Sequence, residues 1–219
     1  VVSRLVGLCE KAGCEAAGIV ANGESVLGIA NNKGLFIYQP STSGEFSTTV
    51  AADNVSGWAE NENRDMSKID FDALTDSAIE TWKIARNPQK LEPGQYTVIL
   101  PSQALADFIL FLTWYGFTPV GYHEGTSPLA GKLGEKIFGD NITLVDDYSH
   151  PMSLGMPFDF EGSPRQKLTL VENGIMKTMV YDRKSAAKYG TKTTGHALPQ
   201  PNSVGAFPGN IIMKGGDSS

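Results

Sequence analysis

Closely spaced turn signals between short apolar segments constrain how the first fifty residues fold. Asn22-Gly23 is a dipeptide that favours a two-residue hairpin turn. Predicted strands and turns alternate along this part of the chain, with strands at 17–21, 26–30, 35–39 and 45–52 and turns at 22–23, 31–34 and 43–44. These connections are too short for the crossover helix that parallel strands require. The pattern therefore predicts an antiparallel meander.

Helical spacing is present on both sides of this segment. Residues 2–12 carry apolar side chains three or four apart, and Gly13 suits a C-terminal cap. Ser67, followed three residues later by Asp70, is typical of the start of a second helix. Its apolar stripe consists of Phe71, Leu74, Ala78, Trp82 and Ala85. Pro88 ends this helix, because the residue before proline is pushed out of helical geometry.

The polar segment 89–94 is the predicted boundary between an N-terminal part, 1–90, and a C-terminal domain, 91–219. The second part has a predicted strand at 96–100 and a predicted helix at 103–115. That helix is apolar most of the way round, so we expect it to be buried on several sides. Asn173-Gly174 is the clearest hairpin turn in the chain. Further predicted elements are strands at 142–145, 167–171 and 175–180 and a helical turn at 184–188.

These elements predict an α+β fold. An N-terminal part with an antiparallel sheet and helices is followed by a β-rich C-terminal domain. The chain begins at Val1 rather than Met and ends in a polar segment, so we expect it to be a piece of a longer protein, with the N-terminal domain represented by its C-terminal portion and the C-terminal domain truncated.

Charge and apolar patterning exclude two classes of partner. The chain has 18 basic and 24 acidic residues, with no cluster of Lys and Arg for phosphate binding, which argues against direct contact with nucleic acid. The apolar run 105–114 is far shorter than the ~20 residues that span a bilayer, which argues against a membrane protein. We interpret Cys9 and Cys14 as buried apolar side chains in a reducing compartment, and predict a cytoplasmic location.

Histidines and acidic residues offer no convincing metal site. His123-Glu124 resembles the start of a zinc-binding helix, but Gly125 and Pro128 oppose a helix and no second histidine follows. The segment 146–150 contains Asp146, Asp147 and His150. For this segment we favour a turn in which aspartates accept hydrogen bonds from backbone amides over a metal site.

Other candidates for catalysis are equally weak. The segment 125–132 resembles a phosphate-binding loop, but its glycine spacing is wrong and Leu133 replaces the required hydroxyl residue. Asp159 and Glu161 would share one face of a strand, and we favour solvated strand residues over an acid–base pair. For His196 we favour a structural hydrogen bond over catalysis. No catalytic residue and no metal ligand is predicted from these patterns.

Several segments, in order along the chain, resemble the TldD/PmbA family. The matching segments are 28–34, 56–59, 125–136, 145–147, 157–162, 170–175, 181–183 and 194–196. Members of the TldD type carry a His-Glu-x-x-x-His helix that binds zinc, with a cysteine ligand near the C-terminus, and members of the PmbA type, also called TldE, lack this motif. The corresponding positions here are 110–115, Leu-Phe-Leu-Thr-Trp-Tyr, and none is a zinc ligand. The chain is therefore similar to the PmbA type.

The resemblance implies a non-catalytic subunit of a metalloprotease assembly that acts on unfolded peptides. It implies a dimer with a TldD-like subunit or with a second copy, zinc in the TldD-like partner and no cofactor in this chain. Six residues are expected to line the peptide cavity: Asp159, Glu161, Gly162, Thr194, Gly195 and His196. Two alternatives stay open, a non-enzymatic regulator linked to DNA gyrase and a self-sufficient hydrolase that uses His196 with Asp159. Whether the chain is itself an enzyme therefore stays open.

Overall fold

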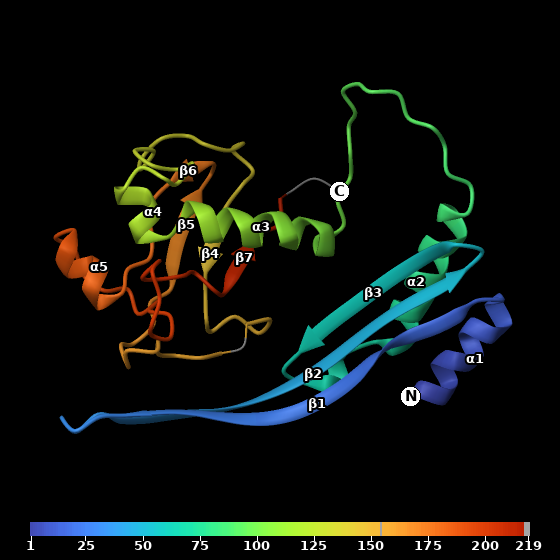
Figure 1. Ribbon diagram of the computed structural model, residues 1–219, viewed down its shortest axis with the longest axis horizontal. Helices are drawn as coiled ribbons and strands as arrows, with labels where there is room; N and C mark the ends of the chain where they lie inside the picture. The colour runs from blue at the N-terminus through green and yellow to red at the C-terminus, as the bar shows by residue number, and fades with distance from the viewer. Residues whose placement is uncertain (154, 217–219) are drawn as a thin grey trace. The chain divides into compact units, whose positions relative to one another are not determined.

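The computed structural model describes residues 1–153 and 155–216 (Figure 1). The chain forms two compact units, one of residues 1–26 and 40–97 and the other of residues 27–39 and 98–219. Helices and antiparallel sheets occur in both, so the predicted α+β class is confirmed. The division at 89–94 remains a prediction. None of the helices in the described ranges is long and apolar enough to cross a membrane.

Helix α1 (Val2–Ala12) begins the first unit and ends as predicted at Gly13, whose φ is 80°. The Gly13 N–H donates to the Glu10 carbonyl at 3.1 Å, and the Cys14 N–H donates to the Cys9 carbonyl at 3.0 Å. This pair of hydrogen bonds is the Schellman motif, which brings the residue after the glycine against the last turn of the helix.

Three strands form a meander in the order β1-β2-β3, where four shorter strands were predicted. They are β1 (Glu15–Ala30), β2 (Phe36–Ala52) and β3 (Val55–Asn63). β2 and β3 pair antiparallel from Gly44 opposite Asn63 to Ala52 opposite Val55. In Figure 1 these strands form a ribbon much longer than either α1 or α2 (Phe71–Ala85).

Two predicted turns, at Asn22-Gly23 and Ser43-Gly44, are wrong, because both dipeptides lie inside continuous strands. The turn predicted at 31–34 is confirmed, and the Asn31 side chain there accepts hydrogen bonds from the backbone N–H groups of Lys33 and Leu35. Pairing of β1 with β2 in the sheet outweighs the local preference of Asn-Gly for a turn.

The sequence patterns missed β3, although a local signal for it exists. Asp53 and Asn54 both have positive φ, 56° and 60°, as the two-residue turn between β2 and β3 requires. Aspartate and asparagine are among the few non-glycine residues that adopt this conformation readily. The dipeptide Asp53-Asn54 is thus the turn that the prediction lacked.

Helix α2 begins one turn later than the predicted capping box. Asp70, not Ser67, is its N-cap, and the Asp70 carboxylate accepts a hydrogen bond from the Ala73 N–H at 3.0 Å. Ser67 lies in a preceding 3₁₀ turn, Met66–Lys68, which Asp65 caps. The helix ends before Pro88, as predicted.

Helix α2 packs closely on β3. A Cβ atom at Gly57 would lie only 1.9 Å from the Ala78 carbonyl oxygen, so glycine is needed for this approach. The Trp82 indole N–H donates to the Ala52 carbonyl at 3.2 Å, which satisfies the polar atom of a buried side chain. The main core cluster of this unit consists of Cys9, Cys14, Val50, Ala59, Ala78, Ile79 and Trp82.

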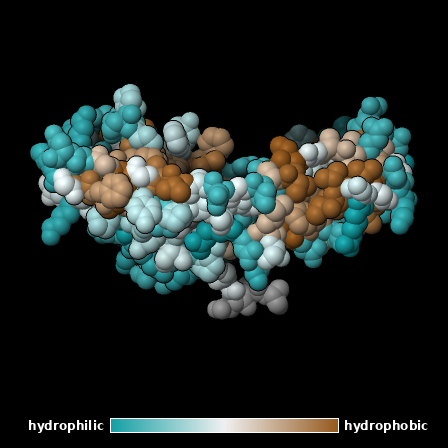
Figure 2. All heavy atoms as spheres, turned by 90° about the horizontal axis from the view of Figure 1, so that it is seen from below, coloured by the Kyte–Doolittle hydropathy of each residue, from teal (hydrophilic) through white to brown (hydrophobic). Residues whose placement is uncertain are grey.

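Several large apolar side chains of the long ribbon are exposed. They are Ile19, Val26, Phe36, Tyr38 and Trp58. Figure 2 shows hydrophobic residues gathered in patches between hydrophilic surface on the face viewed from below. An antiparallel sheet with one covered face accounts for the alternating burial along β3.

The second unit contains a four-stranded antiparallel sheet in the order β6-β5-β4-β7. Its strands are β4 (Leu144–Asp146), β5 (Leu168–Glu172), β6 (Ile175–Met176) and β7 (Ile211–Met213). The hairpin at Asn173-Gly174 is confirmed, with φ of 49° and 79°. The sequence patterns did not predict β7, a short strand at the edge of the sheet.

The predicted strand at 96–100 is wrong, since this segment has no strand assignment. Val98 is 68% exposed and Ile99 is 96% exposed, so the segment has neither a pairing partner nor a core to cover it. The predicted strand at 175–180 is shorter than expected and ends at Met176.

Three helices accompany this sheet: α3 (Ser102–Gly116), α4 (Pro119–His123) and α5 (Arg183–Lys188). Helix α3 forms where predicted, but burial on several sides is wrong. Phe108, Phe111 and Tyr115 are each at least 60% exposed. The core behind α3 and the sheet is formed by Phe117, Leu129, Leu144, Leu170, Val171, Met176, Met179, Val180 and Ala206.

Candidate functional site

The middle of α3 presents large side chains to solvent. Leu110 and Trp114 are about half exposed, whereas Thr113 is buried. The Thr113 hydroxyl donates to the Leu110 carbonyl at 2.8 Å, as expected for a threonine inside a helix. The rings of Phe111 and Tyr115 stack one turn apart, with centroids 6.3 Å apart.

An apolar groove of 560 Å³ lies between α3 and the segment 207–216. Its walls are the side chains of Leu105, Ile109 and Leu110 on one side and Phe207, Ile211 and Met213 on the other. Trp114 closes against Phe207, with ring centroids 5.1 Å apart. Such a groove suits apolar contact, and the polar side chains in its lining are those of Ser102, Thr113 and Lys214.

A second cluster joins the segments 157–166 and 194–197, which contain the family-like segments 157–162 and 194–196. Asp159 is fully buried, and one of its carboxylate oxygens accepts hydrogen bonds from the N–H groups of Glu161 and Ser163, at 3.0 and 2.9 Å. The other oxygen accepts from the Ala197 N–H at 2.9 Å. Asp159 is therefore a connector between loops, and its interpretation as a solvated strand residue is wrong.

Glycine permits the same two segments to approach each other closely. Gly195 has φ of 72°, and a Cβ atom there would lie 2.1 Å from the Pro164 carbonyl oxygen. The Gln166 N–H donates to the Thr194 carbonyl at 3.0 Å. The backbones are thus in direct contact, without side chains between them.

His196 lies at the centre of this cluster and is 1% exposed. Its Nδ1 is 2.8 Å from the Thr194 carbonyl oxygen, which confirms the expected structural hydrogen bond. Its Nε2 lies 3.2 Å from Asp146 Oδ1, and neither atom has a well-aligned hydrogen bond. The neighbour of His196 is therefore Asp146, whereas the Asp159 carboxylate is occupied by backbone amides.

Arg165 completes the buried polar cluster. Burial lowers the pKa of its guanidinium group, and the charges of Asp146 and Asp159 oppose this shift. A half-buried cation that interacts with the charges of two buried carboxylates balances charge inside the fold. This arrangement supports packing of the loops.

Glu161 and Gly162 lie beside this cluster. The Glu161 carboxylate accepts a hydrogen bond from the Arg183 N–H at 2.9 Å, at the first turn of α5. Gly162 has φ of 73° in the turn that Asp159 holds. The structure thus brings the six predicted residues into one region, and their role in lining a peptide cavity remains a prediction.

The Asp147 turn is confirmed. The Asp147 carboxylate accepts hydrogen bonds from the Ser149 N–H at 3.0 Å and the Ser149 hydroxyl at 2.6 Å. Lys167 lies 2.5 Å from the other oxygen. These contacts lower the pKa of Asp147 to about 2, and the hydrogen bond with Lys167 has the largest effect. His150 accepts from the Met152 N–H at 3.3 Å.

Comparison with known proteins identifies the family. The model of the PmbA/TldA metallopeptidase C-terminal domain matches residues 93–219. The chain belongs to the TldD/PmbA family. It is 37% identical over 119 residues to an uncharacterised Methanocaldococcus jannaschii protein, covering 53% of this chain and 29% of that protein. A metalloprotease PmbA homologue of Haemophilus influenzae is 29% identical over 137 residues, covering 59% of this chain and 30% of the homologue.

Solved structures of family members have the same fold. Thermococcus kodakarensis TldE is 28% identical, with a TM-score of 0.76 over 99% of this chain and 51% of that one. A Thermotoga maritima protein named as a candidate modulator of a DNA gyrase is 24% identical, with a TM-score of 0.82 over 99% of this chain and 52% of that one. The present chain thus spans about half the length of these proteins and less than a third of the two curated relatives above.

Several relatives in the TldD/PmbA family are named metalloproteases, and one of them, from Saccharolobus solfataricus, is named a zinc metalloprotease. Zinc takes histidine nitrogen, thiolate sulfur or carboxylate oxygen as ligands. The segment 110–115 of α3 offers one buried threonine hydroxyl, one indole N–H and one phenol among hydrocarbon side chains, so it does not fit zinc. Within residues 1–153 and 155–216, no group of three or more His, Cys, Asp or Glu residues could hold a metal ion.

The sequence patterns missed an aromatic group around His123. The imidazole of His123 stacks on Tyr189, with centroids 3.8 Å apart, and its Nε2 is 3.0 Å from the Tyr181 hydroxyl. Burial, and then the charge of Lys188, lower the pKa of His123. His123 and Tyr181 are 58 positions apart, so no local pattern could have paired them.

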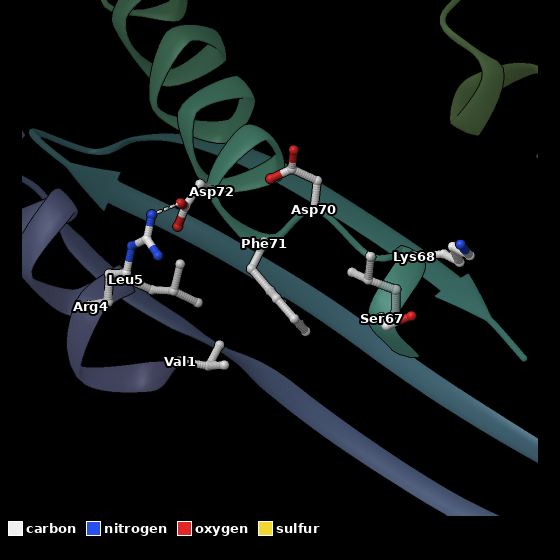
Figure 3. Close-up of a pocket in the computed structure, with 9 residues that line it drawn as sticks. Val1, Arg4, Leu5, Ser67, Lys68, Asp70, Phe71 and Asp72 are labelled. Carbon is white, nitrogen blue, oxygen red and sulfur yellow. Dashed lines mark hydrogen bonds and ion pairs between the residues drawn. The ribbon is translucent and has the colours of Figure 1, made fainter. Parts of the chain in front are cut away.

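A cavity of 330 Å³ in the first unit is shown in Figure 3. It lies between α1 and the start of α2, and Arg4 reaches across it to form an ion pair with Asp72. Asp70, on its wall, caps α2 through the Ala73 N–H. Arg4 and Asp72 thus join the two helices, and Asp70 caps one of them, so these three charged groups already have structural roles.

Proposed function

We propose that this chain is part of a non-catalytic, PmbA-like subunit of a TldD/PmbA-type metalloprotease assembly that acts on unfolded peptides. The observation that carries the proposal is the donor set of α3. Leu110, Phe111 and Tyr115 occupy the positions that correspond to the first histidine, the glutamate and the second histidine of the zinc motif. Hydrocarbon and phenol groups at these positions cannot hold zinc in place of imidazole.

In this proposal a TldD-like partner holds the zinc and cleaves the peptide bond. A homodimer of this chain would have neither zinc nor cleavage activity. This chain would contribute walls and peptide-binding surface. Support for that role comes from the groove between α3 and β7, which is lined mainly by apolar side chains and borders an edge strand. An unfolded peptide exposes apolar side chains and unpaired backbone groups, which such surfaces recognise.

The experiment compares the purified protein alone with a mixture that contains the TldD-like protein from the same source. Cleavage of an unstructured peptide and zinc content per chain are measured in each sample. We expect no cleavage by this protein alone and cleavage by the mixture. A mixture in which the first histidine of the partner's motif is replaced by alanine is the matched control and should be inactive.

Two results would overturn the proposal. Stoichiometric zinc together with cleavage in the sample that contains this protein alone would make the chain a catalyst. The second result is that adding this protein leaves the cleavage rate, the substrate preference and the molecular mass of the TldD-like protein unchanged. That result would rule out a role of this chain as a subunit.

A further inference from the structure

The Schellman motif at the end of α1 brings the two cysteines of the chain together. Cys9 is in the last turn of the helix, and Cys14 is the residue that follows Gly13. In this motif the side chains at these two positions come into contact. The Cys14 thiol lies 3.5 Å from the Cys9 carbonyl oxygen, and both side chains belong to the same core cluster. Both cysteines are free thiols.

The two thiols differ in access to solvent. Cys9 is 1% exposed, whereas Cys14 is 7% exposed and lines an open cavity of 740 Å³. The cavity is formed by the end of α1 and the turn between β2 and β3. Only Cys14 of the pair is among its walls. A small reagent that enters this cavity therefore meets Cys14 first.

The rim of the cavity is acidic. Glu10, Glu15 and Asp53 are among its walls, and the cavity walls include no lysine or arginine. Asp53 is paired with Arg86 at 2.9 Å, so the unpaired negative charge comes from the two glutamates. Such a rim attracts cations and repels anions, and added salt weakens both effects by screening the charges.

We propose that Cys9 and Cys14 form a reversible dithiol–disulfide modification site that reacts with small disulfides and prefers cationic ones. The site is independent of zinc and of peptide cleavage. The short separation of the two residues in sequence and their contact in the fold make the second step intramolecular, so a mixed disulfide is converted rapidly into the internal one.

The reaction proceeds in two exchanges. The Cys14 thiolate attacks one sulfur of the small disulfide, the S–S bond breaks, and one small thiolate leaves and takes up the proton that Cys14 released. Cys9 then loses its proton and attacks the Cys14 sulfur of the mixed disulfide, and the second small thiolate leaves. In total, two electrons and two protons pass from the protein dithiol to the small disulfide, which is reduced to two thiols.

The order of attack agrees with the electrostatics of the pair. Burial, and then the charge and the side-chain hydrogen bond of Cys14, raise the pKa of Cys9 to about 11. Cys9 is therefore a poor first nucleophile at neutral pH. Once Cys14 is in a mixed disulfide, its thiol no longer contributes to this shift, so Cys9 becomes easier to deprotonate for the second step.

The experiment treats the reduced, folded protein with cystamine, a cationic disulfide, at low ionic strength. We expect the protein to lose the mass of two hydrogen atoms and to recover it with dithiothreitol. Trypsin cleaves after Lys11, between the cysteines, so the oxidised protein should yield one cross-linked peptide pair. Oxidised glutathione, which is anionic, should react more slowly, and added salt should reduce this difference.

Two single variants test the order of the steps. Cys9→Ser should stop at one mixed disulfide on Cys14. Cys14→Ser should react at least roughly tenfold more slowly than Cys9→Ser, because the remaining thiol is buried and protonated. Peptide mapping of the unaltered protein does not depend on how well either variant folds.

Three outcomes would overturn the proposal. The first is a stable mixed disulfide on either cysteine of the unaltered protein, and the second is disulfide-linked dimers without the internal cross-link. The third is a rate that rises with urea in proportion to the unfolded fraction, which would show that only the unfolded chain reacts. None of these results would bear on zinc or on peptide cleavage.

Discussion

Replacing Gly195 by alanine should destabilise the second unit more than the same replacement at Gly190. Both glycines have positive φ, 72° at Gly195 and 69° at Gly190, so both variants carry a similar left-handed strain of about 1 kcal/mol. Only Gly195 faces backbone atoms. Its Cβ would lie 2.1 Å from the Pro164 oxygen and 2.7 Å from the Arg165 Cα, whereas nothing lies within 4 Å at Gly190.

The additional cost at Gly195 follows from overpacking. Backbone atoms cannot move aside as the end of a flexible side chain can, so the segments 157–166 and 194–197 must separate. Overpacking of this kind costs about 1–3 kcal/mol. We therefore expect about 2–4 kcal/mol for Gly195→Ala and about 1 kcal/mol for Gly190→Ala.

The assay is equilibrium unfolding in urea, with hydrogen exchange of the segment 157–197 to confirm that the second unit is the part that unfolds. The Gln166 amide, which donates to the Thr194 carbonyl, is a local probe of the contact and should exchange faster in Gly195→Ala. Equal destabilisation by the two variants would refute the close backbone contact and, with it, the arrangement of the polar cluster around His196.

Two further predictions concern buried carboxylates. Asp159→Asn keeps the shape of the side chain but places an amide group where an oxygen now accepts the Ala197 N–H, so it should cost about 1–3 kcal/mol of unfolding free energy. Asp140→Asn, at a side chain that is 82% exposed, is the control and should change stability by less than about 0.5 kcal/mol. Asp147 has its pKa lowered from 3.8 to about 2, so its stabilisation is fully present above pH 3.8 and is lost as the pH falls through about 2. The stability difference between the unaltered protein and Asp147→Asn should therefore shrink by up to about 2 kcal/mol over this range in acid titrations, and a difference independent of pH would contradict the assignment.

Local sequence patterns predicted helices α1, α2, α3 and α5 and the turns at Gly13 and Asn173-Gly174, because these elements depend on neighbouring residues, but they missed α4 and the turn at Asp53-Asn54. Gly13 and Asn173-Gly174 adopt the positive φ that their positions require. Strand lengths were not predictable in this way. Asn22-Gly23 remains extended within β1, which pairs with β2, and 96–100 is not a strand because no strand among the described residues pairs with it.

The candidate site was only partly predictable for the same reason. The segments around Asp159 and His196 stood out by their composition, and the structure brings them together through the Ala197 N–H. The contact of His196 with Asp146 joins residues 50 positions apart and has no local signal. The exposure of α3 could not be predicted either, because an apolar helix pattern indicates burial without specifying what covers each face.

The zinc content of the purified chain tests the central claim most directly. The protein is equilibrated with a slight excess of zinc, dialysed against metal-free buffer and analysed by elemental mass spectrometry. We predict far less than one zinc ion per chain, because Leu110, Phe111 and Tyr115 provide no imidazole or carboxylate. One zinc ion retained per chain, lost when residues 110–115 are replaced by alanine in a variant that still folds, would contradict it.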